Sequence, residues 1–293
     1  MEPVNPHKLT AGLDALRVRR GRVSPLDEIA AREVPFELRL NGRSHIVLLI
    51  SPAQVRELAM GFCLSQGLVD RPGQVEKIAL GRAVLDGLGT VVWADVSLPP
   101  ELARRARTRR VAPAATSCGL CGLESFSQLM TIVPAVDCEG PAVELAVIFQ
   151  LFAAMEARQP VFNATGGTHA AAVGRANGEL IAVVEDIGRH NALDKALGGA
   201  LLAGSDLAGC VVLLSGRVSY EIALKVARAG VPLVGSVSAP TALAVEMLDA
   251  LGVTLLGFGR DPRANVYTHP RRILVHGQPL PQVGSHRLAA LAP

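Results

Sequence analysis

The chain has 293 residues and a net charge of +3, with 49% hydrophobic and 19% charged residues, a composition that predicts a globular, soluble protein with one large domain or two smaller ones. Its five cysteines lack the spacing of a disulfide framework, and its N-terminus lacks the features of a secretory signal. The longest apolar helical stretch, residues 141–158, carries charged side chains and is too short for a membrane span. These features imply no export and no membrane span, and they predict a reducing, cytoplasmic location.

Residues 1–22 are predicted to form an N-terminal extension, and residues 23–112 a smaller, strand-rich α+β region. Asn41-Gly42 separates two strand-like runs and predicts a β-hairpin, because a type I′ turn needs positive φ at both central residues. A helix is expected to begin after Ser51 as N-cap and to close at Gly67. Two further strands follow, and Pro99-Pro100 predicts a boundary.

Basic residues are unevenly divided between the two types. The lysines are Lys8, Lys77, Lys195 and Lys225, which leaves 25 arginines among 29 basic residues. Coding bias is one explanation, and recognition of phosphate or carboxylate by the guanidinium group is another. The cluster at residues 104–110 lacks the aromatic residues of a base-stacking surface, so we expect a solvated segment and no nucleic-acid partner. Guidance of an anionic ligand or acidic partner by this cluster is the alternative.

Residues 113–275 are predicted to form an α/β domain, followed by a tail at residues 276–293. After a helix at residues 143–157, near-continuous apolar strands alternate with helices of about a dozen residues. This rhythm predicts a mostly parallel sheet with helices on both faces.

Polar residues follow several strands of this sheet, where ligands bind in open α/β sheets. Some would only cap helices, but several glycine- and arginine-containing junctions at one edge favour a pocket for a phosphate-bearing ligand. No Walker A or G-x-G-x-x-G pattern is present, and no metal site is expected. The candidate ligand-binding residues are Gly167, Thr168, His169, Arg189, His190, Ser215, Gly216, Arg217, Phe258, Gly259, Arg260, Asp261, Pro262 and Arg263.

Cys118 and Cys121 form a C-x-x-C motif in the segment SCGLCGLESF. A structural zinc site would need a second pair of ligands, and a thioredoxin-like dithiol would follow a strand directly, whereas this motif follows a predicted loop. The third alternative is a thiolate that reacts with or carries sulfur, because Gly119 and Gly122 would give the loop freedom to move.

Several segments together resemble the formate dehydrogenase accessory sulfurtransferase family, FdhD, over residues 25–273. They are SCGLCG, NATGGTHAAA, EDIGRHNALDK, SGRVSYEIALKVARAGVP, SAPTALAVE and GFGRDPRANVYTHP, in this order. The resemblance implies a fold similar to cytidine deaminases. It also implies a cytoplasmic sulfurtransferase that takes persulfide sulfur from a cysteine desulfurase and sulfurates the molybdenum cofactor for the formate dehydrogenase apoenzyme.

In this interpretation Cys118 carries the persulfide and Cys121 assists, while His169 or Glu221 moves the proton. The cofactor, bis(molybdopterin guanine dinucleotide) molybdenum, would be a bound substrate that guanine nucleotides mimic. A homodimer is compatible with the sequence. A non-catalytic cofactor chaperone is the main alternative; a zinc hydrolase of deaminase type is disfavoured because THAAA lacks the required glutamate.

Overall fold

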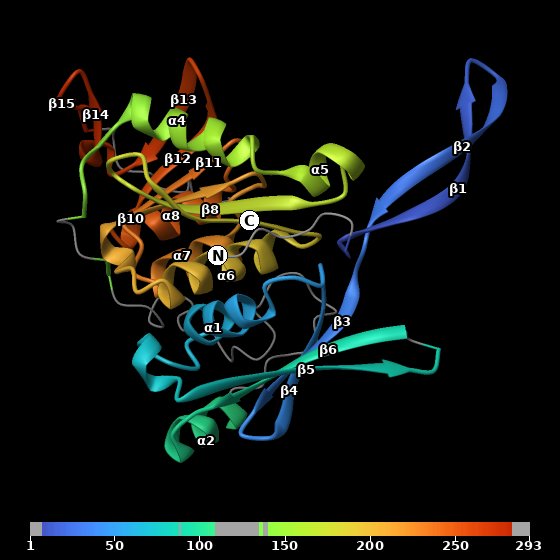
Figure 1. Cartoon of the computed structure of the whole chain (residues 1–293). Helices are drawn as coiled ribbons and strands as arrows, with labels where there is room; N and C mark the ends of the chain where they lie inside the picture. Colours follow the sequence, from blue (N-terminus) through green and yellow to red (C-terminus); the bar gives the residue numbers. More distant parts are fainter. Residues whose placement is uncertain (1–7, 88, 109–134, 137–139, 283–293) are drawn as a thin grey trace, which may run out of the picture.

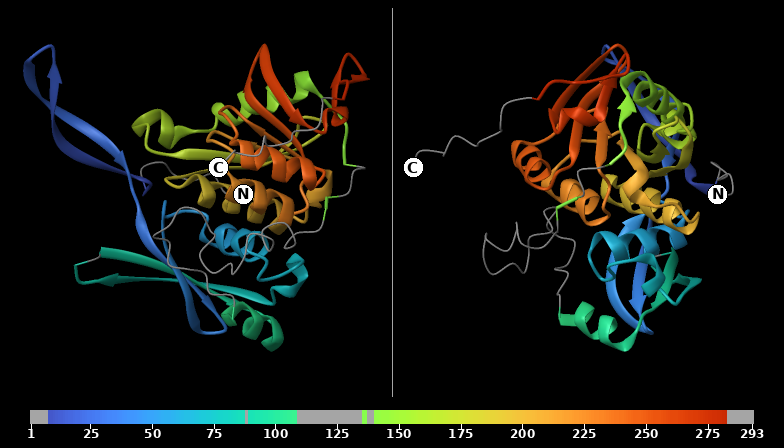
Figure 2. Two further views of the ribbon diagram at one scale, coloured as in Figure 1. Left: turned by 180° about the vertical axis from the view of Figure 1, so that it is seen from behind. Right: turned by 90° about the vertical axis from the view of Figure 1, so that its left-hand side faces the viewer.

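The computed structural model describes residues 8–87, 89–108, 135–136 and 140–282 (Figure 1). A six-stranded sheet and the helices on its faces form one layer system. A four-stranded sheet with one helix forms a second layer system, which packs beneath the first. A long two-stranded hairpin extends away from both (Figure 2).

The four-stranded sheet has the order β4-β3-β6-β5. Asn41 and Gly42 have φ of 50° and 74°, so the predicted hairpin turn is confirmed. One face of the sheet carries Phe36 and Leu38, which are fully buried beneath helix α1. The strands are β3 (Val34–Leu40), β4 (Arg43–Ile50), β5 (Lys77–Leu85) and β6 (Gly89–Ser97), and the helix is α1 (Val55–Ser65).

The start of α1 differs from the prediction. The N-cap is Gln54 in place of Ser51, whereas the predicted end is confirmed, because Gly67 has φ of 67° just beyond the helix. Ser51 lies on a tertiary contact instead: its Oγ accepts a hydrogen bond from Ile187 N at 3.2 Å. A buried contact 136 residues away in the chain therefore overrides the local capping signal.

The N-terminal hairpin consists of β1 (Thr10–Arg19) and β2 (Arg22–Ala31). Arg20 and Gly21 form its turn with φ of 49° and 76°. The boundary expected between residues 22 and 23 therefore falls next to a turn between paired strands, and the hairpin leads through Val34 directly into the four-stranded sheet.

The six-stranded sheet is mixed, which corrects the expectation of a mostly parallel one. In the order β13-β12-β11-β10-β8-β9, only the pairs β10–β11 and β11–β12 are parallel. The tight turn at Gly178, with φ of 90°, returns the chain from β8 to β9 as a hairpin, and such short connections join antiparallel strands. The strands are β8 (His169–Arg175), β9 (Leu180–Asp186), β10 (Cys210–Leu214), β11 (Leu233–Ser236), β12 (Thr254–Arg260) and β13 (Arg263–Thr268).

Helices cover both faces of this sheet, as predicted. Val211 and Leu213 point toward Phe152 of the helix at residues 145–156, while Val212 and Leu214 point to the other side. Every second side chain of a strand faces the same way, so both sets are buried. The helices are α4 (Leu145–Glu156) on one face and α6 (Arg189–Leu202), α7 (Tyr220–Arg228) and α8 (Ala242–Ala250) on the other.

Shorter elements complete the described chain. Helix α2 (Pro100–Thr108) contains part of the arginine cluster; Ala103 and Ala106 are buried, whereas Arg104 is exposed and pairs with Glu101. The segment before Gly167 is the short helix α5 (Pro160–Thr165). The others are β7 (Val143–Glu144), β14 (Ile273–Val275), β15 (Gln278–Pro279) and the single 3₁₀ turns η2 (Pro72–Gln74), η3 (Leu207–Gly209) and η4 (Pro270–Arg272).

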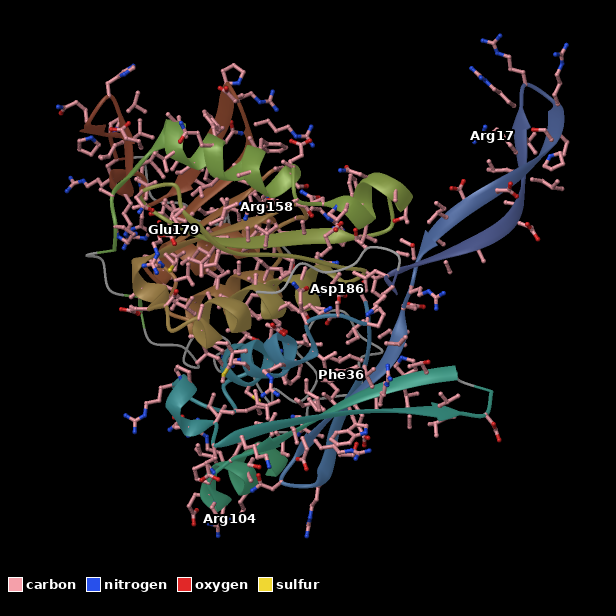
Figure 3. All side chains as sticks on the ribbon, viewed as in Figure 1. Arg17, Phe36, Arg104, Arg158, Glu179 and Asp186 are labelled. Atoms are coloured by element: carbon pink, nitrogen blue, oxygen red, sulfur yellow. The ribbon has the colours of Figure 1, made fainter. Side chains whose placement is uncertain are left out.

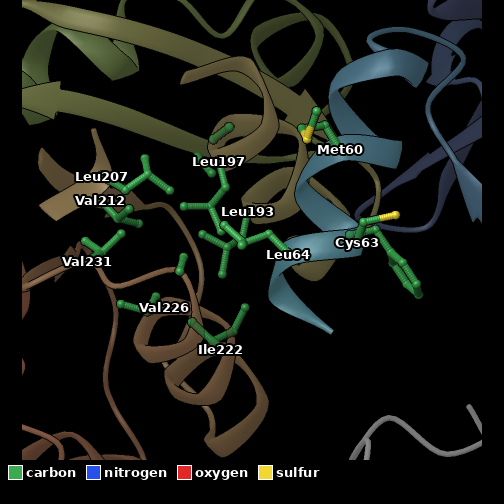
Figure 4. Close-up of a cluster of buried hydrophobic side chains, with 14 of the residues drawn as sticks. Met60, Cys63, Leu64, Leu193, Leu197, Leu207, Val212, Ile222, Val226 and Val231 are labelled. Carbon is green, nitrogen blue, oxygen red and sulfur yellow. The ribbon is translucent and has the colours of Figure 1, made fainter. Parts of the chain in front are cut away.

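One hydrophobic core joins the two layer systems. Helix α1 lies against α6 and α7, and Leu64 meets Leu193 and Ile222 within it (Figure 4). At the crossing of α1 and α6, a Cβ on Gly61 would lie 1.8 Å from the carbonyl oxygen of Asp194. The absence of side chains there lets the two helix backbones touch. Helix α6, which begins at the candidate ligand-binding residue Arg189, is thus fixed to helix α1 of the N-terminal region.

Candidate functional site

The candidate ligand-binding residues meet at one edge of the six-stranded sheet. Strands β9, β10, β11 and β12 end at this edge, and the antiparallel β8 begins there, because His169 pairs with Asp186 and Ala171 with Leu214. The junctions after these strands and the β12–β13 turn therefore lie side by side, as the sequence predicted.

Hydrogen bonds link neighbouring junctions. Ser215 Oγ accepts from Ala170 N at 2.8 Å, and Ser236 Oγ donates to the carbonyl oxygen of Gly216 at 2.7 Å. The Ser215 hydroxyl therefore holds the start of β8 in place through Ala170. Gly216 lies directly against the start of β8, since a Cβ there would be 3.3 Å from His169 Nδ1.

Three polar atoms near the starts of α6 and α7 are buried without a hydrogen-bond partner among the described residues: Arg189 Nε, His190 Nε2 and Ser219 Oγ. His190 Nε2 lies 2.7 Å from Glu221 Oε2, but the two groups are not oriented to form a hydrogen bond. Ser219 is the N-cap of α7, yet its side chain caps nothing. Helix N-termini carry partial positive charge, so this corner of the edge favours an anion.

Arg189 and Arg217 enclose a tight recess with Gly216. In this structure the recess has no room for a molecule the size of water. A ligand would have to displace the arginine side chains or lie over them at the surface, and the exposed Arg217 has the freedom for either.

His169 is half-buried at the same corner. Burial lowers the pKa of its imidazole, and the charges of Arg189 and His190 lower it further. The ring is therefore kept neutral at neutral pH and is able to accept a proton. Glu221, the other candidate for proton transfer, lies on α7 with its Oε2 2.7 Å from His190 Nε2.

The β12–β13 turn presents the second group of candidate residues. Arg260, Asp261, Pro262 and Arg263 are exposed, and the Arg263 guanidinium lies 5.8 Å from the centre of the Phe258 ring. Gly259 has a packing role: a Cβ there would lie 2.4 Å from Phe152. The turn therefore offers two exposed guanidinium groups and an aromatic ring at the end of the site.

Thr168 and Gly167 are held by packing contacts. Thr168 is buried, and its Oγ1 donates to Glu185 Oε1 at 2.9 Å. Glu185 also accepts hydrogen bonds from Val161 N and Phe162 N, so its carboxylate caps the start of α5. A Cβ on Gly167 would lie 3.3 Å from Ala31 Cβ. Both candidates thus lie at the edge, but their described contacts are structural.

Asp186, Asp194 and Lys195 of the segment EDIGRHNALDK also have structural partners. Asp186, which lies where the two layer systems meet (Figure 3), forms a fully buried ion pair of 2.6 Å with Lys195. Asp186 Oδ1 accepts from Gly188 N at 2.9 Å, which fixes the loop that carries Arg189. Asp194 pairs with Lys225 at 2.6 Å and accepts from Ser65 of α1. These residues position the ligand-binding edge without facing it.

Cys118 and Cys121 lie outside the described residues. Of the described cysteines, Cys63 is fully buried, and burial together with Asp194 raises the pKa of its thiol to about 12. Burial also raises the pKa of Cys210. Neither thiol is suited to react as a thiolate at neutral pH.

Two kinds of feature are absent from the described residues. No helix in the ranges given above is long and apolar enough to cross a membrane. Within the same ranges, no three His, Cys, Asp or Glu side chains gather in a group that could hold a metal ion.

The sequence and the structure both match known proteins. Residues 31–274 match the FdhD/NarQ family. The chain is 41% identical over 261 residues to the sulfur carrier protein FdhD of Bordetella petrii, with 88% of this chain and 92% of that protein covered. It is 40% identical over 258 residues to the protein of the same name from Cupriavidus necator, with 88% of each covered. A crystal structure of a formate dehydrogenase accessory protein from Desulfotalea psychrophila matches with a TM-score of 0.71 and 25% identity, covering 91% of this chain and 100% of that one.

Proposed function

Because this chain belongs to the FdhD/NarQ family, we propose that it is a sulfur carrier that serves formate dehydrogenase. Cys118 takes sulfur from a cysteine desulfurase, and Cys121 assists. In the loading step the Cys118 thiolate attacks the outer sulfur of the donor persulfide. A new S–S bond forms, the donor S–S bond breaks, and the donor cysteine leaves as a thiolate. The raised pKa values of Cys63 and Cys210 support the choice of the C-x-x-C pair.

The acceptor in this proposal is the bis(molybdopterin guanine dinucleotide) molybdenum cofactor, bound as a substrate before it enters the formate dehydrogenase apoenzyme. Its phosphates are anionic and its guanine bases are planar, and both properties suit the guanidinium groups of Arg189, Arg217 and Arg260 at the sheet edge. His169, neutral at working pH, is the group that moves a proton during transfer. A second copy of the chain is a further partner.

One observation carries the cofactor part of this proposal. At the corner where α6 and α7 begin, Arg189 Nε, His190 Nε2 and Ser219 Oγ are buried without a hydrogen-bond partner among the described residues. Buried polar groups without partners destabilise a protein, so such a cluster favours a ligand that provides acceptors.

Titration calorimetry with guanosine diphosphate tests the site. Arg217→Ala and Arg260→Ala should each weaken binding by about 1.5 to 3 kcal/mol, or roughly 10- to 150-fold, through the loss of a charged hydrogen bond. Arg175→Ala is the matched control, because Arg175 is an exposed arginine at the opposite end of β8. Unchanged affinity in both site variants would place the nucleotide elsewhere.

The non-catalytic chaperone remains the alternative function. It shares the ligand-binding edge but requires no sulfur on Cys118. Mass spectrometry after incubation with a cysteine desulfurase and cysteine separates the two, since only a sulfur carrier gains the mass of one or more sulfur atoms.

A further inference from the structure

Helix α2 begins a cluster of arginines that the ligand-binding edge does not use. Residues 102–123 contain no aspartate or glutamate, although the whole chain has a net charge of only +3. The arginines of this stretch are Arg104, Arg105, Arg107, Arg109 and Arg110. Positive charge is therefore concentrated directly before Cys118 in the sequence.

The packing of α2 turns two of these arginines outward. Ala103 and Ala106 are buried as part of the hydrophobic core, whereas the side chains of Arg104 and Arg105 are 67% and 46% exposed. Each of the two arginines forms an exposed ion pair with a neighbouring carboxylate. Exposed ion pairs are weak, so both guanidinium groups can exchange these partners for carboxylates of another molecule.

Helix α2 lies far from the ligand-binding edge. Figures 1 and 2 show α2 at the opposite end of the molecule from α5, the helix that precedes His169 and the start of β8. A molecule that binds to α2 therefore leaves the cofactor site open.

Covalent geometry keeps Cys118 within reach of α2. Cys118 follows Thr108, the last residue of α2, by ten residues. An extended chain spans at most about 3.5 Å per residue, so Cys118 is within about 35 Å of the end of α2 whatever path the chain takes. A small domain is about 30 Å across, so a protein docked on α2 can bring its own reactive group to Cys118.

The form of α2 favours a protein over other anionic ligands. Small molecules bind in concave sites, and these arginines project from the convex surface of a helix. Single-stranded nucleic acids stack on aromatic side chains, and residues 104–110 contain none. A helix on a membrane surface exposes a large apolar face, whereas Leu102, Ala103 and Ala106 are half-buried or buried.

We propose that α2 is the docking surface for the protein that supplies sulfur to Cys118, and that this protein presents an acidic patch to Arg104 and Arg105. This inference rests on the proposed function, in which a cysteine desulfurase loads Cys118. Opposite charges steer two proteins together and orient them, so α2 holds the donor beside the segment that carries Cys118. The cofactor binds at the other end of the molecule, so donor and acceptor do not compete for one surface.

The rate of sulfur loading tests this surface. Arg104→Glu with Arg105→Glu, the α2 variant, reverses two charges. Arg175→Glu with Arg271→Glu is the matched control, because it changes the net charge equally at two exposed positions outside α2. With a cysteine desulfurase and cysteine at low donor concentration and about 50 mM salt, the α2 variant should load at least tenfold more slowly than the wild type, and the control within about twofold of it.

Salt should act differently on the two proteins. Screening weakens attraction between exposed charges, so the wild-type loading rate should fall at least about fivefold between 50 and 300 mM salt. The rate of the α2 variant should change less than about twofold over the same range, because the attraction that salt screens is already absent.

Cysteine persulfide, a small donor that needs no docking surface, separates docking from reactivity. Positive charge near a cysteine also favours its thiolate, so arginines that acted only on Cys118 would slow loading from both donors when reversed. Docking predicts that the wild type and the α2 variant load from cysteine persulfide at the same rate. The affinity for guanosine diphosphate should also be unchanged, because the ligand-binding edge is distant. If the reversal prevents folding, Arg104→Gln with Arg105→Gln serves in its place and should show a smaller slowing with the desulfurase alone.

Equal loading of the wild type and the α2 variant by the desulfurase would overturn the docking proposal, as would slower loading of the variant from both donors. Equal loading together with weaker binding of a single-stranded oligonucleotide by the variant would identify a nucleic-acid surface. A wild type that gains no sulfur from either donor would overturn the proposed function itself, so the two failures are distinguishable.

Discussion

Lys195 Nζ lies 2.6 Å from Asp186 Oδ2, and both side chains are fully buried. Lys195 also donates to the carbonyl oxygen of Ser51 at 2.9 Å, and Ser51 N donates to Asp186 Oδ2 at 3.1 Å. Burial lowers the pKa of Lys195, and the carboxylate of Asp186 opposes that shift. The pair therefore ties the loop before α6, which carries Arg189, to the N-terminal region.

Replacement of Lys195 by Met should reduce the free energy of unfolding by about 3 to 5 kcal/mol, because it leaves the Asp186 carboxylate buried and unpaired. Urea unfolding measures the change. Arg175→Met is the matched control: its ion pair with Glu179 is exposed, so its loss should cost no more than about 1 kcal/mol. Equal effects of the two substitutions would show that the buried pair has no special role.

The crossing of α1 and α6 predicts a second sensitive position. A Cβ on Gly198 would lie 1.9 Å from the carbonyl oxygen of Glu57, and the obstacle is backbone that has no rotamer to change. Gly198→Ala should therefore destabilise the chain by about 1 to 3 kcal/mol or more, although alanine favours a helix. Gly209→Ala is the control, because nothing lies within 4 Å of a Cβ there. A Gly198→Ala protein as stable as the wild type would mean that the two helices can move apart with little loss in the free energy of unfolding.

Much of the α/β fold could be predicted from local patterns. The helices predicted between the apolar strands are present, and in one of them, α6, the apolar residues repeat at helical spacing. Asn41-Gly42 predicted its hairpin through the positive φ that both positions adopt. The direction of β8 was missed, although Asn177-Gly178 between two apolar runs is the same kind of signal.

The site could be predicted only in part. Its position at one sheet edge followed from where strands end, but the partners of Glu185, Asp186 and Asp194 depend on residues far away in the chain. A carboxylate beside a strand end has the same local pattern whether it faces a ligand or a buried lysine. The hairpin β1–β2 was not predicted: residues 1–22 were expected to form an extension, and the alternation of side chains in β1 was not recognised.

Histidine burial predicts how stability depends on pH. Burial lowers the pKa of His45, and its Nε2 has no hydrogen-bond partner within the described ranges. The unfolded chain, with a histidine pKa of about 6.5, therefore binds a proton more readily than the folded one. Stability should fall as the pH decreases from about 7.5 to 5.5.

Urea unfolding across that pH range should show a smaller fall for His45→Gln than for the wild type, because one of the groups that protonate on unfolding is gone. His276→Gln, at an exposed position, is the control and should fall as the wild type does. If the stability of His45→Gln fell with pH as steeply as that of the wild type, this would contradict a lowered pKa of His45 in the folded protein.

Sulfur loading tests the chemistry of the C-x-x-C pair. After incubation with a cysteine desulfurase and cysteine, the intact protein should gain about 32 Da per sulfur atom, and Cys118→Ala should abolish the gain because the nucleophilic thiolate is missing. Cys210→Ala is the matched control: burial raises the pKa of that thiol, so its removal should leave loading unchanged. Loading that survives Cys118→Ala but disappears with Cys121→Ala would reverse the roles of the two cysteines. Loading that depends on neither would place the sulfur on another cysteine, and a wild type that gains no mass would favour the non-catalytic chaperone.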